Sequence, residues 1–397
     1  MAGQFIVNSK TFCIVPWANT HINTDGGLVP CCKISADFPT KNIDNIEDFS
    51  KDWWNDEPMQ QLRSDLVKGI KTKYCNSCWI DEETGKSSLR QGFNKRLAKH
   101  TNLRKIAKSS TYVAEDLPIA LDLNFSNICN YKCLMCGPDR SSKIQTERKQ
   151  NEVKFKSLDF LLPLVNYDFD WPNKDKFQTF FKNVMPNVRE LVLKGGEPLL
   201  IKDVMPTIKS VENKKRCAVA ISTNGSVEFD DDFVDQLKQF QQIWLCVSVD
   251  GILEHGEYVR HGSQWPTVHN TIVKLSKLEN CNFQLSTVLQ FYSSLTFPRI
   301  VDYAIANDLD INLLFCDTPD FLSIHSMLPG HHAKFLQFIN EKIQQHPHIQ
   351  WLKSVQGYLG IYKFDPVLHE QCRQYTNTMD DIRNNRLDTV QELFQDA

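Results

Sequence analysis

Three closely spaced cysteines are the residues most clearly placed to do chemistry in this chain. Cys129, Cys133 and Cys136 follow the pattern Cys-x3-Cys-x2-Cys, which puts three soft thiolates on one short loop. Thiolates of this kind suit an iron-sulfur cluster, but a 4Fe-4S cluster normally takes four cysteine ligands. One iron would therefore lack a nearby protein ligand, and an open position on a metal can bind a small molecule. A structural zinc site, closed by four ligands, is the alternative.

The segment that leads into this loop has the pattern of a β-strand. Residues 119–125 alternate apolar and polar side chains and are rich in β-prone residues. Because the cysteine loop follows directly, we expect it at the C-terminal edge of a sheet.

The cysteine spacing resembles that of the radical S-adenosylmethionine (SAM) superfamily. This resemblance implies that the amino and carboxylate groups of SAM chelate the iron left open by Cys129, Cys133 and Cys136. It further implies that the 4Fe-4S cluster passes one electron to the sulfonium, so that SAM is cleaved to a 5′-deoxyadenosyl radical. Met135 stands where many members carry an aromatic residue, and its thioether or backbone is expected to contact the adenine.

A second cysteine group lies in the N-terminal part of the chain. Two of its cysteines flank residues 21–30, where an Asp-Gly pair predicts the tight turn of a β-hairpin. Residues 46–67 have helical spacing and would return the chain to a Cys-x2-Cys pair. The thiols that would then converge are those of Cys13, Cys31, Cys75 and Cys78.

The order Cys-x12-Gly-x4-Cys followed by a distant Cys-x2-Cys resembles the twitch or SPASM-type auxiliary cluster modules of radical SAM enzymes. In most of those enzymes the module follows the barrel. Here it comes first, as in a group of radical SAM proteins with an N-terminal twitch domain, which the chain resembles over nearly its whole length. The resemblance implies a second 4Fe-4S cluster. Cys32 competes with Cys31 for one ligand position, and a zinc knuckle built from the same cysteines is the alternative.

Strand-like and helical patterns alternate after the first cysteine loop. Alternation at this spacing predicts an α/β fold with a parallel sheet and crossover helices. The resemblance implies a partial (β/α)6 TIM-like barrel, whose active site lies at the C-terminal strand ends. The predicted strands are residues 119–125, 188–193, 217–222, 243–249, 283–289 and 311–316. The predicted helices between them include residues 201–211, 229–240, 265–278 and 297–307.

A glycine-rich segment follows the second of these strands. Two glycines allow a ligand to approach the backbone, and a glutamate can accept a hydrogen bond from an ammonium group. The segment resembles the GGEP motif of the superfamily, which implies contacts to the amino group of SAM. Its residues are Gly195, Gly196, Glu197 and Pro198.

Polar residues also follow the third and fourth strands. Ser248 and Arg260 resemble the SxDG and HDxxRG-like segments of SPASM and twitch enzymes, which implies that they bind the SAM carboxylate. An arginine fork suits a carboxylate, so the chemistry agrees. Thr223 and Asn224 are expected to reach SAM or its ribose. Simple capping of strand ends is the alternative for each of these residues.

The remaining candidates are weaker. Cysteines inside the predicted strands are expected to be small buried hydrophobes, although Cys316 lies at a strand end beside Asp317. Beyond the last strand, His325, His331 and His332 suit surface or capping positions. The sequence therefore names no catalytic base.

The length of 397 residues suits one enzyme barrel with an accessory module. We expect an auxiliary cluster domain at 1–85, a basic connector at 86–115, the barrel at 116–320 and a C-terminal helical extension at 321–397. From Lys86 to residue 108 the connector carries lysines and arginines but no acidic residue. It could meet phosphate groups of a nucleic acid, but without interleaved aromatic residues a helix packed across the barrel is favoured.

The chain has no apolar run of membrane-spanning length and no signal-peptide pattern. Most of its thirteen cysteines stand in close groups in a long chain, which favours metal ligation over disulfides. We therefore expect a cytoplasmic protein without a membrane partner.

Taken with the resemblance, these features predict a radical SAM enzyme that abstracts hydrogen from a peptide or protein. Its cofactors would be two 4Fe-4S clusters and SAM, and its electrons would come from an external flavodoxin or ferredoxin. A small sugar, a nucleotide or RNA is the alternative substrate. A non-catalytic iron-sulfur or zinc scaffold is the alternative of another class.

Overall fold

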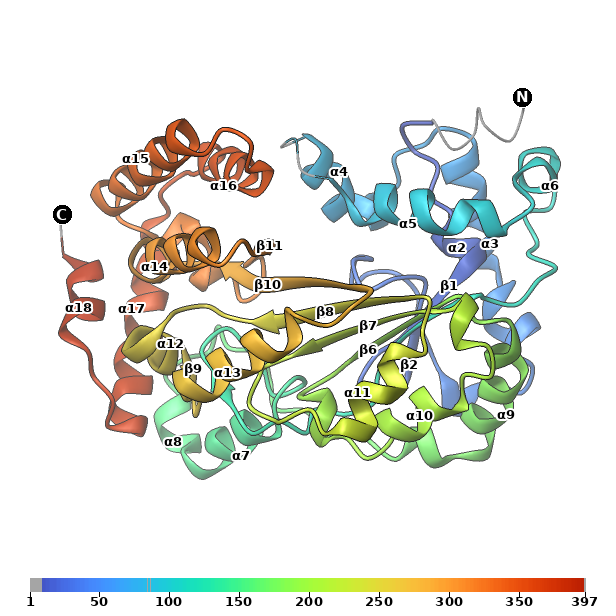
Figure 1. The fold of residues 1–397 in the computed structure, drawn as a ribbon, viewed down its shortest axis with the longest axis horizontal. Helices are drawn as coiled ribbons and strands as arrows, with labels where there is room; N and C mark the ends of the chain where they lie inside the picture. Colours follow the sequence, from blue (N-terminus) through green and yellow to red (C-terminus); the bar gives the residue numbers. More distant parts are fainter. Residues whose placement is uncertain (1–8, 84, 86, 396–397) are drawn as a thin grey trace.

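A single nine-stranded sheet runs through the computed structural model, which describes residues 9–83, 85 and 87–395 (Figure 1). Lys86, named above as the start of the basic connector, lies outside the described residues. The strands follow the order β11-β10-β8-β7-β6-β4-β1-β2-β3. The strands that come after the first cysteine loop thus stand in chain order on one side of β4.

The strands from β4 to β11 in this sheet all pair in parallel, which confirms the predicted α/β alternation. Their bounds lie close to the expected ones, whereas closure into a partial barrel stays a prediction. The strands are β4 (Ala120–Asn124), β6 (Glu190–Lys194), β7 (Ala218–Thr223), β8 (Gln242–Ser248), β10 (Cys281–Leu289) and β11 (Asp310–Phe315).

Helices cover one face of this sheet through apolar stripes. In α11, for example, Phe233, Val234 and Leu237 are buried at helical spacing. Every second residue of the strands faces these stripes; Leu191 and Leu245, for example, are fully buried. The covering helices are α10 (Val204–Ser210), α11 (Asp231–Lys238), α13 (Trp265–Leu275) and α14 (Ser293–Ala306).

The N-terminal hairpin extends the same sheet. The strand β1 (Asn19–Ile22) pairs in parallel with β4, with Asn19 beside Ala120 and Ile22 beside Leu123. On its other side β1 pairs antiparallel with β2 (Gly27–Val29), which in turn pairs with β3 (Lys41–Asn42). The expected boundary near residue 85 is therefore crossed by a continuous backbone hydrogen-bond network.

The hairpin turn depends on one glycine. Gly26 has a φ of +80°, a conformation that residues with a Cβ rarely adopt, and an added Cβ would lie 3.1 Å from the ring of Trp171. The Trp171 indole nitrogen donates a hydrogen bond to the Thr24 carbonyl over 3.1 Å. The segment after the cysteine loop therefore holds the hairpin in place.

The helix expected at 46–67 begins later than predicted. The segment forms a short π-helical turn (Ser50–Trp54), and the α-helix α3 spans only Glu57–Val67. Asp56 is the N-cap, because its side chain accepts a hydrogen bond from the Met59 backbone, and Pro58 lies in the first turn. The capping residues, rather than the apolar spacing, thus set this boundary.

The basic connector packs against the opposite face of the sheet through α5 (Leu89–Leu97), with the shorter α6 (Leu103–Lys108) after it. Arg90 pairs with Glu82, and Arg96 donates two hydrogen bonds to Glu190 over 2.9 and 3.0 Å. Arg96 also lies over the Trp244 ring. These two arginines are used inside the protein, as the packed-helix interpretation expects.

The C-terminal part forms α15 (Pro329–Gln345), α16 (Gln350–Gly360), α17 (Pro366–Arg383) and the short α18 (Asp388–Gln391). The helix α17 ends at Arg383 because Asn384 adopts a left-handed conformation with φ of 47°. Over the part of the chain that the structure describes, no helix is both long and apolar enough to cross a membrane.

The shared sheet predicts that the N-terminal hairpin and the following strands unfold together. Ile22 is fully buried on β1, so Ile22→Ala should lower the free energy of unfolding by about 2–5 kcal/mol through lost burial and a cavity. Urea unfolding followed by far-UV circular dichroism should show one transition at a lower midpoint. The matched variant Ile70→Ala, at a position that is 48% exposed, should change the midpoint little. Two separate transitions in the wild type would contradict this prediction.

Candidate functional site

The first cysteine loop is held against a second short strand pair. Within the loop, β5 (Lys132–Cys133) pairs antiparallel with β9 (Arg260–His261), so that Cys133 lies beside Arg260. The Leu134 backbone adds a hydrogen bond to the Val259 carbonyl over 2.9 Å. The tertiary fold therefore brings together a predicted cluster ligand and a predicted SAM-binding arginine that are far apart in the sequence.

The three thiols of the loop are near one another. The neighbouring Cys136 thiol and the charge of Arg260 lower the pKa of Cys133, although burial opposes this. The same contact and burial raise the pKa of Cys136 well above its ordinary value. Burial also raises the pKa of Cys129, and the nearby Cys133 thiol raises it further. Crowded, buried thiols of this kind gain from a bound cation, which takes up their negative charge as their protons leave.

The glycine-rich segment packs directly on the cysteine loop. The Gly196 and Glu197 backbone nitrogens donate to the carbonyls of Ser126 and Ile128 over 2.9 and 2.7 Å. A Cβ at Gly196 would lie only 2.1 Å from the Ile128 oxygen. Close approach of the two loops, in addition to any ligand, thus requires this glycine.

The side chain of Glu197 is buried and already has partners. Its carboxylate accepts hydrogen bonds from the Thr223 hydroxyl over 2.8 Å and from the Asn224 backbone over 2.6 Å. Burial raises the pKa of Glu197 despite these bonds. Pro198 begins a short 3-10 turn (Pro198–Leu200) that Glu197 caps. Glu197, Thr223 and Asn224 thus form one connected group.

Asn224 ties this group to the cysteine loop. Its amide nitrogen donates to the Asn130 side chain over 2.9 Å and lies 3.8 Å from the Cys129 sulfur. Asn224, Ser248 and Arg260 also line one narrow cavity. The predicted SAM-binding residues, which come from different strand ends, are therefore gathered beside the predicted cluster ligands.

Arg260 is oriented by a residue that the sequence did not mark as functional. Its Nη1 donates to Asp250 over 2.6 Å, and the other Asp250 oxygen accepts from the Val288 backbone over 2.7 Å. The Arg260 Nε is buried and has no hydrogen-bond partner among the described residues. A bound carboxylate would satisfy that donor, which agrees with the predicted role of this side chain.

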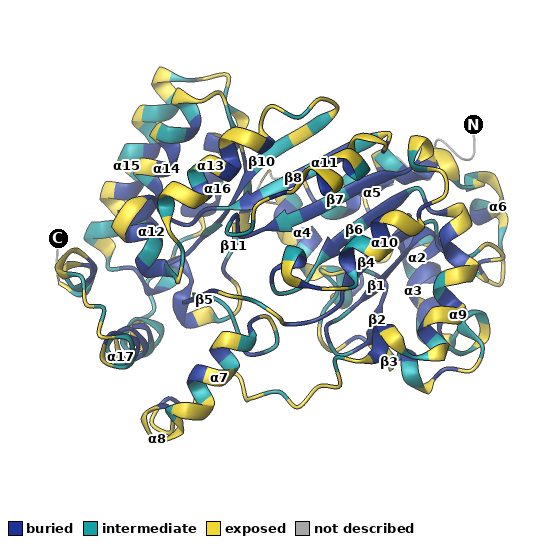
Figure 2. Cartoon of the chain, turned by 60° about the horizontal axis from the view of Figure 1, so that its bottom comes forward, coloured by how far each residue is buried: buried dark blue, intermediate teal, exposed yellow. Residues whose placement is uncertain are grey.

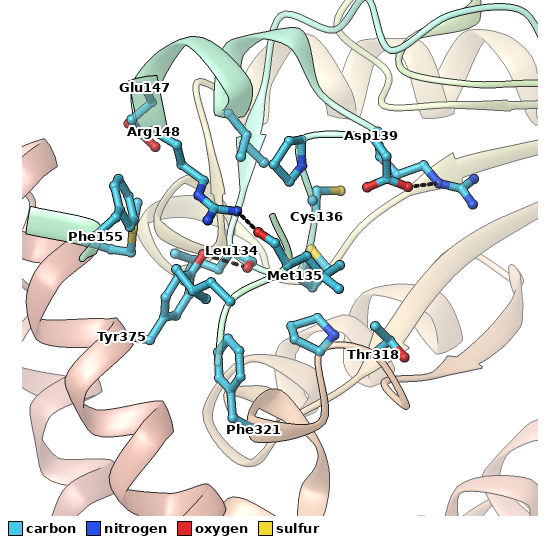
Figure 3. Close-up of a pocket in the computed structure, with 18 of the residues that line it drawn as sticks. Leu134, Met135, Cys136, Asp139, Glu147, Arg148, Phe155, Thr318, Phe321 and Tyr375 are labelled. Carbon is cyan, nitrogen blue, oxygen red and sulfur yellow. Dashed lines mark hydrogen bonds and ion pairs between the residues drawn. The ribbon is translucent and has the colours of Figure 1, made fainter. Parts of the chain in front are cut away.

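A cavity of about 370 Å³ opens beside the third cysteine (Figure 3). Met135 and Cys136 lie in its wall together with Thr318 and Phe321, which follow the last strand. Cys316 itself is buried, and its thiol donates to the Pro319 carbonyl. The cavity is large enough for a planar ring, and its wall is mostly apolar.

The helix α17 closes this cavity and contacts the cysteine loop, which the sequence did not indicate. The Tyr375 hydroxyl donates to the Leu134 carbonyl over 2.9 Å, between two of the cysteines. Arg383 donates two hydrogen bonds to Glu147, which also pairs with Lys132 over 2.6 Å. The C-terminal extension therefore supports the loop from outside.

The second cysteine group also assembles. Burial raises the pKa of the Cys13 thiol, and Cys75 and Cys78 are near enough to raise it further. Cys31 has a raised pKa for the same reasons, with Cys13 and Cys75 among its neighbours. Among the described residues, no three histidine, cysteine or acidic side chains are already placed to hold one metal ion.

Cys32 points elsewhere. It is exposed, and its sulfur lies 3.6 Å from the Lys194 ammonium, on the side of the parallel strands. Cys31 instead lies near Cys13 and Cys75, which favours it over Cys32 as the fourth ligand. Four cysteines in one neighbourhood match the number and type of ligands that a 4Fe-4S cluster takes.

A protein-family comparison bears on this N-terminal group. Residues 13–79 match SPASM, described as an iron-sulfur cluster-binding domain. The chain carries a SPASM-type iron-sulfur domain. The match confirms the expected SPASM/twitch-type module and its iron-sulfur cofactor, and it spans all four cysteines of the group.

Comparisons with whole proteins give more distant likenesses. A search of the curated proteins finds no significant match. Among solved structures, the chain is similar to native anSMEcpe with bound AdoMet, at 18% identity over 57% of this chain and 62% of that one, with a TM-score of 0.40. It is also similar to Streptococcus suis SuiB bound to S-adenosylmethionine, at 14% identity over 85% and 69% of the two chains, with a TM-score of 0.38. The chain thus spans less than two thirds of the length of anSMEcpe.

The ion pairs of Glu147 predict a pH-dependent contribution to stability. Burial opposes ionisation, but Arg383 and Lys132 hold the pKa of Glu147 below its ordinary value. Glu147→Gln leaves Arg383 buried with a weaker partner and should cost about 3–5 kcal/mol near pH 7. Because a lowered pKa stabilises only above the unfolded-state value, this difference from wild type should shrink below about pH 4.

Urea unfolding of the wild type and of Glu147→Gln, from neutral pH to below about pH 4, measures this difference in stability. The control Glu254→Gln breaks a half-exposed pair with Arg299 and should change stability by less than about 1 kcal/mol. A difference for Glu147→Gln that stays constant from neutral to acidic pH would contradict the prediction.

Proposed function

We propose that this SPASM-type protein is a radical SAM enzyme with an N-terminal auxiliary cluster. The observation that carries the proposal is the convergence of Cys129, Cys133 and Cys136 with Gly196, Asn224 and Arg260. A scaffold protein needs the cysteines but has no use for an arginine with a free buried donor beside them.

Each group has a role in holding SAM and its cluster. The loop cysteines would hold a 4Fe-4S cluster, and Gly195 to Pro198 would hold the SAM amino group next to it. Arg260, oriented by Asp250, would bind the carboxylate with Ser248, while Thr223 and Asn224 would lie toward the ribose. Met135 would contact the adenine from the wall of the adjoining cavity. When bound, the cluster and SAM would together supply reductive cleavage of SAM and the means to abstract a hydrogen atom from the substrate.

The second cluster would be held by Cys13, Cys31, Cys75 and Cys78. With four cysteine ligands it has no open iron, so we assign it electron transfer rather than SAM binding. An external flavodoxin or ferredoxin would supply the electrons.

We favour a peptide or protein as substrate, because SPASM and twitch relatives commonly modify them. A small sugar or nucleotide is the second candidate. RNA is less favoured, since Arg90 and Arg96 of the basic connector are used in internal ion pairs.

Loss of one loop cysteine should abolish the radical reaction. In anaerobically reconstituted protein, Cys129→Ala should form no 5′-deoxyadenosine from SAM under reducing conditions, because a cluster ligand is missing. Liquid chromatography with mass spectrometry measures the product. The control Cys281→Ala changes a cysteine outside both groups and should retain product formation. Equal product from Cys129→Ala and wild type would contradict the proposed function.

The auxiliary group should hold its own cluster. Wild-type protein should bind roughly eight irons, and Cys75→Ala should bind roughly four, since each cluster contains four. Iron and sulfide analysis after reconstitution gives these values, with Cys281→Ala again as control. One cluster in the wild type, or zinc bound in preference to iron, would overturn the second site.

A further inference from the structure

Opposite the covering helices the sheet has a polar face, of which the proposed mechanism uses only Ser248 at the end of β8. Strand register aligns one residue from each parallel strand in a single row across this face. Along β8 the residues of this face are partly exposed and those of the helix-covered face are buried, and Figure 2 shows the same alternation of colours. The residues of the row are Asn124, Lys194, Ser222, Cys246, Gln284 and Asp310.

Lys194 is the cation of this row. Its ammonium lies 2.9 Å from the Asp122 carboxylate, which in turn lies 3.1 Å from His21 on β1. The Asp122 side chain is 3% exposed, whereas that of Lys194 is 32% exposed. The buried carboxylate therefore fixes the ammonium but is itself closed to a ligand.

Lys194 lies between the two cysteine groups. In the chain it directly precedes Gly195, at the predicted SAM site. In space its Nζ is 3.6 Å from the exposed sulfur of Cys32, which follows Cys31 of the auxiliary group. Burial raises the pKa of the Cys246 thiol on β8, and the nearby charge of Lys194 acts to lower it. A molecule on the polar face would thus meet this ammonium within reach of both centres.

We propose that Lys194 binds a carboxylate group of the substrate on the polar face. An ammonium has three donors, and the Asp122 and Cys32 contacts account for two of them. The third N–H donor would form its strongest hydrogen bond with a carboxylate, because the bond would then be charge-assisted. This inference rests on the proposed function, because it concerns the substrate of the same site.

Two sources of the carboxylate are possible in a peptide substrate. An aspartate or glutamate side chain and a free C-terminus present the same group, and the experiment below separates them. The competing explanation is that the Lys194–Asp122 ion pair only stabilises the sheet. In that case Lys194 would have no affinity for external anions.

The first test measures anion binding without any radical reaction. Cys32, beside Lys194, is alkylated in reconstituted protein with iodoacetate or with neutral iodoacetamide, and peptide mapping by mass spectrometry gives both rates. The same thiol reacts in both cases, so the ratio of rates reports attraction of the carboxylate. We expect Lys194→Met to lower the iodoacetate-to-iodoacetamide ratio about fivefold or more, the effect of removing a nearby charge.

Control variants keep this test decisive. Lys194→Arg should retain the ratio, and Lys209→Met, which removes an exposed lysine paired with Asp232, should leave it unchanged. If Lys194→Met does not fold because Asp122 is left unpaired, the double variant Lys194→Met with Asp122→Asn removes both charges. An unchanged ratio in the foldable variant, or a Cys32 that neither reagent reaches, overturns the proposal.

The second test uses deuterated peptide mixtures and follows deuterium into 5′-deoxyadenosine. One mixture has central aspartate or glutamate with an amidated C-terminus, one has central asparagine or glutamine with a free C-terminus, and one lacks both carboxylates. Preference for the first or second mixture over the third identifies the source, and Lys194→Met should reduce that preference about fivefold. Equal transfer from all three, or SAM cleavage without transfer from any, overturns the inference. Absence of 5′-deoxyadenosine instead counts against the proposed function, while the alkylation ratio still stands.

Discussion

The parallel pairing of β1 with β4 is the contact on which the rest of the structure depends. It places His21 of the N-terminal hairpin beside Asp122 and joins the hairpin that Cys13 and Cys31 flank to the sheet that leads into the first cysteine loop. Because backbone hydrogen bonds within a sheet allow little relative movement, the N-terminal hairpin is held at a constant position relative to β4.

A second constraint is the close approach of three loops around Cys133. The Gly196 backbone touches the Ile128 carbonyl, Arg260 lies opposite Cys133, and Tyr375 donates to Leu134 from α17. Each contact comes from a different part of the chain. The cysteine loop is therefore positioned by its neighbours rather than by its own short strand, and the C-terminal extension takes part in the site.

Charge inside the protein is arranged in linked pairs. Asp250 orients Arg260, Asp122 orients Lys194, and Glu147 joins Arg383 to Lys132. In the first two pairs the acid is almost fully buried and the base is more exposed, so that the base keeps a donor for a ligand.

The sequence by itself determined the local features. Alternation of apolar residues set the parallel strands, with β4 expected at 119–125 and found at Ala120–Asn124, and cysteine spacing marked both thiol groups. The joining of β1 to β4 was decided only by the tertiary structure, as were the pairing of Cys133 with Arg260 and the row that contains Lys194. Local patterns record which residues face a core, but register between distant strands depends on long-range packing that short windows of sequence do not contain.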